Sequence, residues 1–258
     1  MFFIIRISRT RLLAISLLVL VCIAGLISGI PYTQTASSSN KLLPVYSIET
    51  NEKVVALTFD ISWGTQVPEP VLKILEEKQV TCTFFLSGPW VLRNQDIAKN
   101  IKEKGHEIGS HSNRHVNHSS LSVTDIQTEL LKAARAIEDV LGVKPWLLRT
   151  PNGDYNNRVI QTAESLGYTV IQWDTDSLDW TKPGAAQIVS RVVKKAHPGD
   201  IILLHASDSA SETPEALPHI IDQLRQKGYR FVLVSELLKF DPAGRWPNLP
   251  GPPRRVAK

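Results

Sequence analysis

Short apolar runs rich in β-branched residues alternate with longer segments of helical periodicity, and this alternation restricts the fold of the chain more than any other feature. The runs predict strands at residues 54–59, 81–86, 106–110, 146–149, 169–173, 200–205 and 230–234. The helical period is clearest over residues 124–141, where apolar side chains recur every three or four positions and Gly142 follows. Repeated βα units of this kind indicate a parallel sheet.

We therefore predict an α/β fold, a distorted (β/α) barrel of about seven parallel strands in a single domain at residues 48–240, behind an N-terminal membrane segment. A Rossmann-type sheet is the competing arrangement. No glycine-rich phosphate loop follows the first predicted strand, and ionisable side chains follow most of the strands instead. Because the C-terminal ends of parallel strands open on one face, these side chains are expected to form one site.

The N-terminal region carries a candidate membrane segment. Residues 12–30 form a run of 19 residues without a charge, and three arginines precede it within residues 1–11. That length and that basic cytoplasmic flank are typical of a spanning helix. The alternative is a cleaved signal peptide, although its apolar region is usually about 7–15 residues long and no clear cleavage site follows. Both alternatives export the domain, either anchored on the extracytoplasmic side or secreted.

The predicted domain has polar flanks. Residues 31–47 are small, polar and interrupted by proline, which predicts a linker. Residues 241–258 hold five prolines and no apolar period, which predicts a disordered basic tail. The net charge of +4 comes from the two ends of the chain, so the domain has no basic excess for binding nucleic acid. Nothing in the sequence predicts a protein partner.

Coordinating and ionisable side chains gather just after the predicted strands. They are Asp60, His111, His115, Arg149, Asp176, Asp179 and His205. His111 and His115 are four residues apart, so both imidazoles can face one divalent cation, and nitrogen donors favour Zn²⁺. Taken alone, such a pair more often belongs to a polar turn. With a metal present, the pKa of a bound water falls towards neutrality, and a nearby carboxylate can take its proton.

These motifs resemble the polysaccharide deacetylases, the NodB-homology domain of carbohydrate esterase family 4. Five segments match that family's five motifs in order: LTFDIS at 57–62, HSNRH at 111–115, RTPNGDY at 149–155, DSLDW at 176–180 and IILLH at 201–205. The likeness covers residues 52–240. The segments FDISWG and DIILLHASDS are most similar to the sporulation-associated PdaB-type members.

The resemblance implies a hydrolase that removes N-acetyl groups from a cell-envelope polysaccharide, either peptidoglycan or a chitin-like glycan, by metal-assisted attack of water. Asp60 is then the catalytic base and His205 the acid that protonates the departing amine. Arg149 would orient Asp60 and keep it ionised. Asp179, with Asp176 in reserve, would hold His205 and raise its pKa.

Substrate contacts are also implied by the resemblance. Trp180 and Leu203 fit the wall of a pocket for the acetyl methyl group, although such side chains are more often plain core. Asn152 stands where the third motif of the family has an aromatic residue, so its backbone N–H can still hold the oxyanion while the aromatic wall is lost. Pro151 precedes it and is assigned to the same substrate-binding group.

One position departs from the family pattern. Asp60 is followed by Ile61, where the family has a second aspartate that completes an Asp-His-His metal site, and isoleucine cannot bind a cation. Three outcomes are open. Asp60 itself binds the ion; His118 supplies a nitrogen, although a polar surface residue is the plainer interpretation of His118; or the site for Zn²⁺ or Co²⁺ is weak or empty.

Two other function classes stay open beside the deacetylase. A non-catalytic glycan-binding module would keep the cleft but have lost the metal chemistry, as Ile61 and Asn152 indicate. A different metal-assisted hydrolase would act on another acyl bond, since a fold does not determine a substrate. The expected partners are a cell-wall polysaccharide and the membrane, through residues 12–30.

Overall fold

The computed structural model describes residues 41–246, and this part of the chain is built on a parallel β-sheet. Its strands are β1 (Val54–Ile61), β2 (Thr83–Leu86), β3 (Glu107–Ser110), β4 (Leu147–Leu148), β5 (Thr169–Val170), β6 (Thr175–Asp176), β7 (Asp200–His205) and β8 (Arg230–Phe231). Seven of them follow the order β5-β4-β3-β2-β1-β7-β6, and β8 pairs with the start of β1. Strands β1 to β5 are neighbours in chain order, whereas a Rossmann sheet reverses its order midway. The predicted distorted barrel is confirmed.

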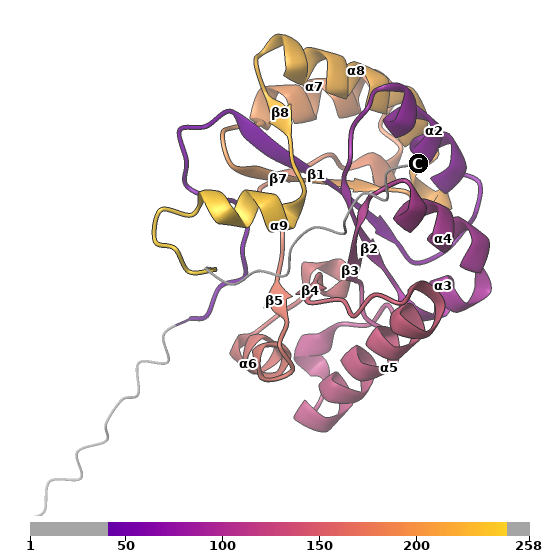
Figure 1. Cartoon of the computed structure of the whole chain (residues 1–258), viewed down its shortest axis with the longest axis vertical. Helices are drawn as coiled ribbons and strands as arrows, with labels where there is room; N and C mark the ends of the chain where they lie inside the picture. Colours follow the sequence, from indigo (N-terminus) through magenta and orange to yellow (C-terminus); the bar gives the residue numbers. More distant parts are fainter. Residues whose placement is uncertain (1–40, 247–258) are drawn as a thin grey trace, which may run out of the picture. The chain divides into compact units, whose positions relative to one another are not determined.

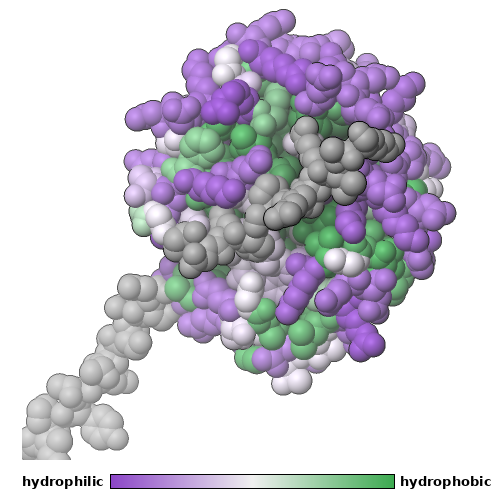
Figure 2. All heavy atoms as spheres, in the orientation of Figure 1, coloured by the Kyte–Doolittle hydropathy of each residue, from purple (hydrophilic) through white to green (hydrophobic). Residues whose placement is uncertain are grey.

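Helices surround the sheet (Figure 1). They are α2 (Pro68–Glu77), α3 (Gly88–Arg93), α4 (Gln95–Glu103), α5 (Val123–Leu141), α6 (Asn157–Ser165), α7 (Ala185–Lys195), α8 (Thr213–Gln226) and α9 (Val234–Leu237). Helix α5 begins one residue before its predicted start, because the side chain of Ser122 caps it by accepting from Asp125 N–H. It ends at Gly142, whose φ of 62° is left-handed. Figure 2 shows hydrophilic side chains over the outer helices, with apolar side chains visible between them.

Side chains of β1 alternate between two buried apolar clusters. Ile61 belongs to the outer cluster, between the sheet and the helices, whereas Val54 and Ala56 belong to the inner cluster with residues of α9. Since successive side chains point to opposite faces of a strand, Thr58 and Asp60 continue the inner row. The inside of the barrel is therefore apolar where β1 begins and becomes polar towards its C-terminal end.

The segment before β1 bridges the open side of the barrel. Val45 pairs in parallel with Ile171, just after β5, and Ser47 pairs in antiparallel with Asp200 at the start of β7. Among the described strands, β5 and β6 are the two ends of the sheet, so this segment covers the gap. The prediction of a linker over residues 31–47 is wrong for its last residues, because their backbone groups are hydrogen-bonded to the sheet.

Three smaller predictions also need correction. The strand expected at 230–234 ends at Phe231, because Leu233 already caps α9. Strand β6 was not predicted, because two residues are too short to show an alternation. The predicted disorder of residues 241–258 does not begin at 241, because Asp241 accepts hydrogen bonds from the backbone and guanidinium of Arg245.

The ends of the chain carry the remaining predictions on domain organisation. Residues 1–40, which include the basic flank and the candidate membrane segment at 12–30, lie outside the described residues, as do residues 247–258. Between residues 41 and 246, no helix combines the length and the apolar composition that crossing a bilayer requires.

Candidate active site

A buried ion pair joins the C-terminal end of β1 to the residue after β4. Arg149 Nη1 donates to Asp60 Oδ1 at 2.9 Å and to Thr58 Oγ1 at 2.8 Å, and Nη2 donates to the carbonyl of Gln172 at 2.9 Å. The guanidinium also lies over the ring of Phe85, 4.2 Å from its centroid. Arg149 is fully buried and Asp60 nearly so. The carboxylate is therefore held in one orientation, as predicted for a residue that Arg149 positions.

The charge of this carboxylate is stabilised by its neighbours. Burial by itself raises the pKa of Asp60, but the charges of Arg149 and His205, the hydrogen bond from Arg149 and, at acidic pH where its ring is protonated, the charge of His111 together outweigh burial. The net pKa of Asp60 lies below its ordinary value. Asp60 is therefore ionised at neutral pH and able to accept a proton.

The two histidines of the second motif lie beside Asp60. His111 Nδ1 donates to the carbonyl oxygen of Arg149 at 2.9 Å, so its unprotonated Nε2 lies 3.7 Å from Asp60 Oδ2. The ring centroid of His115 is 5.5 Å from that of His111. Burial lowers the pKa of both rings, that of His111 to about 4. Both are thus neutral at physiological pH, which is the form that binds a metal.

The rest of the family's metal site does not assemble around these histidines. Ile61 is fully buried in the outer apolar cluster, and it supplies no donor atom. His118 is also fully buried and shares a hydrogen bond of 2.8 Å with Ser112 Oγ, so the interpretation as a surface residue is wrong. Within residues 41–246, no three His, Cys, Asp or Glu side chains are placed to hold a metal ion. The residues present do not fit the three-ligand site that the resemblance implies.

Replacing Ile61 with aspartate is expected to lower the free energy of unfolding by about 3–5 kcal/mol, because it places an unpaired charge among apolar side chains. The control Ile61→Val should cost only about 0.5–1.5 kcal/mol. Urea unfolding at pH 7, with and without Zn²⁺, measures both. If Zn²⁺ returned Ile61→Asp to wild-type stability, the carboxylate would have reached the histidines, and the placement of residue 61 in the outer cluster would be wrong.

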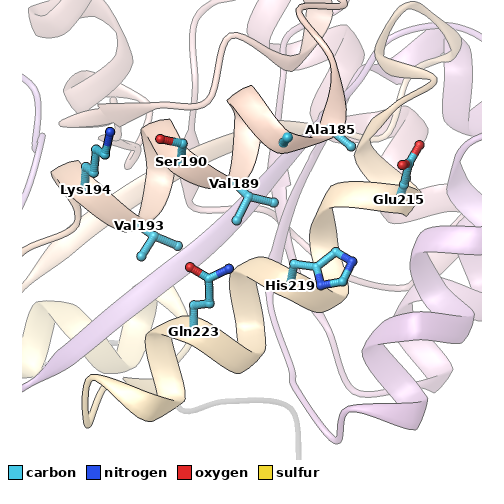
Figure 3. Close-up of a pocket in the computed structure, with 9 residues that line it drawn as sticks. Ala185, Val189, Ser190, Val193, Lys194, Glu215, His219 and Gln223 are labelled. Atoms are coloured by element: carbon cyan, nitrogen blue, oxygen red, sulfur yellow. The ribbon is translucent and has the colours of Figure 1, made fainter.

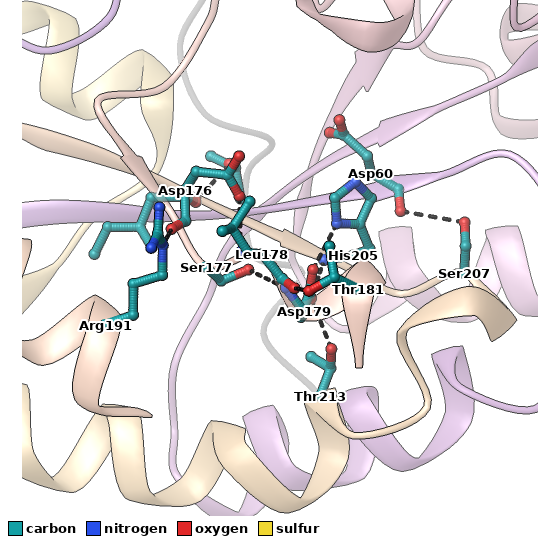
Figure 4. A network of polar contacts seen from close by, with 12 residues as sticks. Asp60, Asp176, Ser177, Leu178, Asp179, Thr181, Arg191, His205, Ser207 and Thr213 are labelled. Carbon is teal, nitrogen blue, oxygen red and sulfur yellow. Dashed lines mark hydrogen bonds and ion pairs between the residues drawn. The ribbon is translucent and has the colours of Figure 1, made fainter. Parts of the chain in front are cut away.

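A histidine–aspartate pair lies on the other side of Asp60. His205, on β7, is the register partner of Asp60 on β1. Its Nδ1 and its backbone N–H donate to the two carboxylate oxygens of Asp179, each at 2.7 Å, and Thr213 Oγ1 donates to Asp179 Oδ2 at 2.7 Å. Figure 4 shows the His205 ring between Asp60 and Asp179. The reserve candidate, Asp176, instead accepts from the backbone N–H of Leu178.

The protonation of His205 depends on this pair. Burial by itself lowers the pKa of His205, but the hydrogen bond to Asp179 and the charges of Asp179, Asp60 and Asp176 raise it above its ordinary value. The stability contributed by the pair is therefore fully present below a pH of about 6.5 and is lost as the pH rises through the folded-state pKa. His205 can thus carry a proton near neutral pH.

Replacing Asp179 with asparagine is expected to lower the pKa of His205 below about 6.5, because burial then acts without its main opposing charge. NMR titration of the His205 ring, compared with wild type, measures the shift. The variant Asp176→Asn leaves the hydrogen bond between His205 and Asp179 in place, so it should shift the titration midpoint of His205 much less. An unchanged midpoint in Asp179→Asn would contradict the role of that carboxylate.

The four expected substrate contacts differ in exposure. Trp180, on the 3₁₀ turn η3 (Asp179–Thr181), is 52% exposed, so it is not a plain core residue. Leu203 is buried in β7. Asn152 has a left-handed φ of 58°, and its side chain donates to Asn117 Oδ1 at 2.8 Å. Pro151, just before it, is buried. Their roles towards a substrate stay predictions.

Three residues that support the site were not predicted from the sequence. Thr58 bonds Arg149, Thr213 bonds Asp179, and the ring of Trp63 meets the ring of His115 edge-on with 5.3 Å between centroids. Thr58 could have been found, because it lies two residues before Asp60 and so on the same strand face. Nothing in the pattern connects Thr213 with a carboxylate 34 residues away.

A pocket of about 500 Å³ lies away from this site, between α7 and α8 (Figure 3). Val189 and Val193 of α7 and His219 and Gln223 of α8 are among the side chains that line it. None of the residues of the site contributes to this lining, so the chemistry described above does not involve the pocket.

Comparison with known proteins gives consistent matches. The sequence profile described as polysaccharide deacetylase matches residues 47–171. A peptidoglycan-N-acetylglucosamine deacetylase of Bacillus cereus is 37% identical over 198 residues, which cover 76% of this chain and 92% of that protein. YlxY of Bacillus subtilis is 38% identical over 195 residues, which cover 76% of this chain but only 60% of that longer protein.

A solved structure is similar across the same region. It is a family 4 carbohydrate esterase pseudoenzyme from Bacillus anthracis, with 35% identity and a TM-score of 0.73, and the match covers 77% of this chain and 70% of that chain. A mutant of the same pseudoenzyme, described as having restored enzymatic activity, matches with the same TM-score of 0.73.

Proposed function

Because the chain belongs to the polysaccharide deacetylase family, we propose that it removes N-acetyl groups from a cell-wall polysaccharide, with peptidoglycan as the substrate. The observation that carries this proposal is the juxtaposition of two complete pairs, one buried and one partly buried. Asp60, which is bonded to Arg149, and His205, which is bonded to Asp179, are register partners on the neighbouring strands β1 and β7. One pair holds an ionised carboxylate and the other an imidazole whose pKa is raised, as a base and an acid acting on one bond require.

In the proposed reaction, Asp60 and His205 each transfer one proton. Asp60 takes a proton from water as the water oxygen attacks the acetyl carbonyl carbon. His205 then gives its proton to the sugar nitrogen as the C–N bond breaks, which releases acetate and a free amine. Asp60 afterwards loses its proton to solvent, and His205 regains one. Each such transfer contributes about 10²–10⁴-fold to a rate.

Two further groups complete this proposal. The backbone N–H of Asn152 would donate to the oxygen that becomes negative in the tetrahedral intermediate. Trp180 and Leu203 would contact the acetyl methyl group. Members of the family generally use a divalent metal, whereas this chain keeps His111 and His115 without the second carboxylate. No step of the proposed reaction therefore passes through a metal.

Acetate release by the purified full-length chain tests the function. N-acetylated peptidoglycan, chitin oligosaccharides and an O-acetylated xylan serve as substrates, each with and without added Zn²⁺ or Co²⁺. Release of acetate with the appearance of free amines from an N-acetylated glycan is expected, and His205→Asn should abolish it. Acetate from the xylan alone would support the alternative of a hydrolase for another acyl bond. No release under any condition would overturn the proposal.

A non-catalytic glycan-binding module is the second candidate, and the burial of Ile61 in the outer cluster favours it. The similarity to a pseudoenzyme supports it as well. Such a module would bind peptidoglycan fragments without releasing acetate under any metal condition. Acetate release, rather than bound metal, separates the two candidates, because no step of the proposed reaction passes through a metal.

We also propose that the domain acts outside the cytoplasm. The uncharged run at residues 12–30, preceded by three arginines, supports a membrane anchor or a signal peptide, and a cell-wall substrate requires export. The likeness of residues 59–64 and 200–209 to sporulation-associated members supports a role in the spore wall. N-terminal sequencing of the protein recovered from membrane and medium fractions would distinguish anchoring from cleavage.

A further inference from the structure

Trp63 is a large apolar side chain that remains exposed beside the site. It lies in the loop between β1 and α2, and 44% of its surface is accessible. Its ring meets that of His115 edge-on at 5.3 Å, the His115 ring is 5.5 Å from the His111 ring, and His111 Nε2 is 3.7 Å from Asp60 Oδ2. A continuous row of contacts therefore leads from the catalytic carboxylate to an exposed indole.

The loop that carries Trp63 is held in place by the loop after β7. The carboxylate of Asp208 accepts hydrogen bonds from three successive backbone N–H groups, those of residues 65–67, at 2.8–3.2 Å. The backbone N–H of Ser62 donates to Ser207 Oγ at 3.1 Å, and Trp90 Nε1 donates to the carbonyl of Gly64 at 2.7 Å. The backbone is thus fixed on both sides of Trp63.

Gly64 makes this arrangement possible. Its φ of +83° lies in the left-handed region, and a Cβ atom there would be 2.1 Å from Asp208 Cγ. Only glycine allows the carboxylate to approach the loop so closely. An indole on a fixed loop loses little conformational freedom when it binds a ligand. The free energy gained from its contact area is therefore not offset by a large entropy cost.

A second exposed tryptophan lies next to Asp179 in the chain. Trp180 follows Asp179, which bonds His205, the register partner of Asp60. In the part of the chain that the structure describes, Trp63 and Trp180 are exposed by 44% and 52%. Trp63 thus ends a row of contacts that begins at Asp60, and Trp180 directly follows the residue that holds His205. The apolar C–H face of a pyranose ring fits the face of an indole, and a glycan chain offers several such rings.

We propose that Trp63 is a sugar-binding residue, and that its indole stacks against the pyranose ring next to the one that is deacetylated. The site then takes a glycan of two or more sugars in preference to a single sugar. Asp208 is the positioning residue that keeps the indole in place. This inference rests on the proposed glycan substrate, and it holds for either a deacetylase or a glycan-binding module.

Binding of N-acetylchitotetraose and of N-acetylglucosamine to the full-length chain, measured by isothermal titration calorimetry, tests the proposal. Trp63→Ala is expected to weaken tetramer binding about tenfold, in line with the free energy of an aromatic contact, and to leave monomer binding unchanged. Trp63→Phe should retain most of the affinity. Asp208→Ala should weaken tetramer binding although Trp63 is present. Leu131→Ala, a change to an apolar side chain on α5 that is 54% exposed, is the control and should have no effect.

The outcomes also separate this inference from the proposed activity. Wild-type binding of the tetramer that depends on Trp63, without acetate release, would reject the deacetylase and keep the sugar-binding residue. Equal tetramer binding by Trp63→Ala and wild type would overturn the inference, as would absence of tetramer binding by wild type. A fall in kcat for all substrates with unchanged binding would show that Trp63 only supports His115, which would overturn it too. Near-ultraviolet circular dichroism confirms that each variant is folded.

Discussion

Replacing Asp60 with asparagine is expected to lower kcat for acetate release by about 10²–10⁴-fold, because an amide cannot take the proton of the attacking water. Asparagine has nearly the same size, and its carbonyl oxygen can still accept the bond that Arg149 Nη1 now makes at 2.9 Å. The fold and the affinity for the glycan should therefore be retained. Acetate assays and calorimetry on the same preparation measure the two properties separately.

The matched control for Asp60→Asn is Asp139→Asn. Asp139 carries a carboxylate on α5 whose side chain is 63% exposed, and its replacement should leave kcat unchanged. If Asp60→Asn kept kcat within about threefold of wild type, which is far less than the loss of a general base causes, Asp60 would not be the base.

The pH dependence of the wild-type protein follows from the same pairs. The pKa of Asp60 is lowered, so the base stays ionised down to below about pH 3.9, and activity falls when it is protonated. The pKa of His205 is raised, so the acid stays protonated to above about pH 6.5, and activity falls when it is deprotonated. The rate should therefore pass through a broad maximum between these two limits.

Replacing Arg149 with leucine is expected to lower the free energy of unfolding by about 3–5 kcal/mol at pH 7, because it leaves the Asp60 carboxylate buried without its partner. Asp60 has a lowered pKa, so its contribution to stability is present above a pH of about 3.9 and is lost as the pH falls through the folded-state pKa. In Arg149→Leu the carboxyl should bind a proton more readily. The loss of stability should therefore be smaller at pH 4 than at pH 7, as urea unfolding at both values would show.

An exposed ion pair provides the control for this second prediction. Arg135 Nε lies 3.6 Å from Asp139 Oδ2 on α5, and the two side chains are 85% and 63% exposed. Solvent screens such pairs, so Arg135→Leu should leave the unfolding midpoint almost unchanged. Equal stability of Arg149→Leu and wild type at pH 7 would contradict the assigned role of the buried pair.

Much of the fold and of the site could be predicted because it depends on local patterns. Strand β7 was predicted with its observed bounds, and helix α5 to within one residue. The signals that predict them, an apolar run for the strand and an apolar period with capping residues for the helix, are local to each segment. Asp60, Arg149, Asp179 and His205 were predicted as a group from motif content and from their places at the ends of strands. Parallel strands bring those ends together regardless of the loops between them.

The sequence by itself determined the α/β class, the residues proposed as base, acid and their partners, and the absence of a second aspartate after Asp60. Only the tertiary structure decided that Ile61 faces the helices, that Val45 pairs with Ile171, and that Asp208 holds the loop beside Trp63. The physical reason is sequence separation. The bonds from Asp208 join residues more than 140 positions apart, and such contacts depend on how the whole barrel packs rather than on any local period.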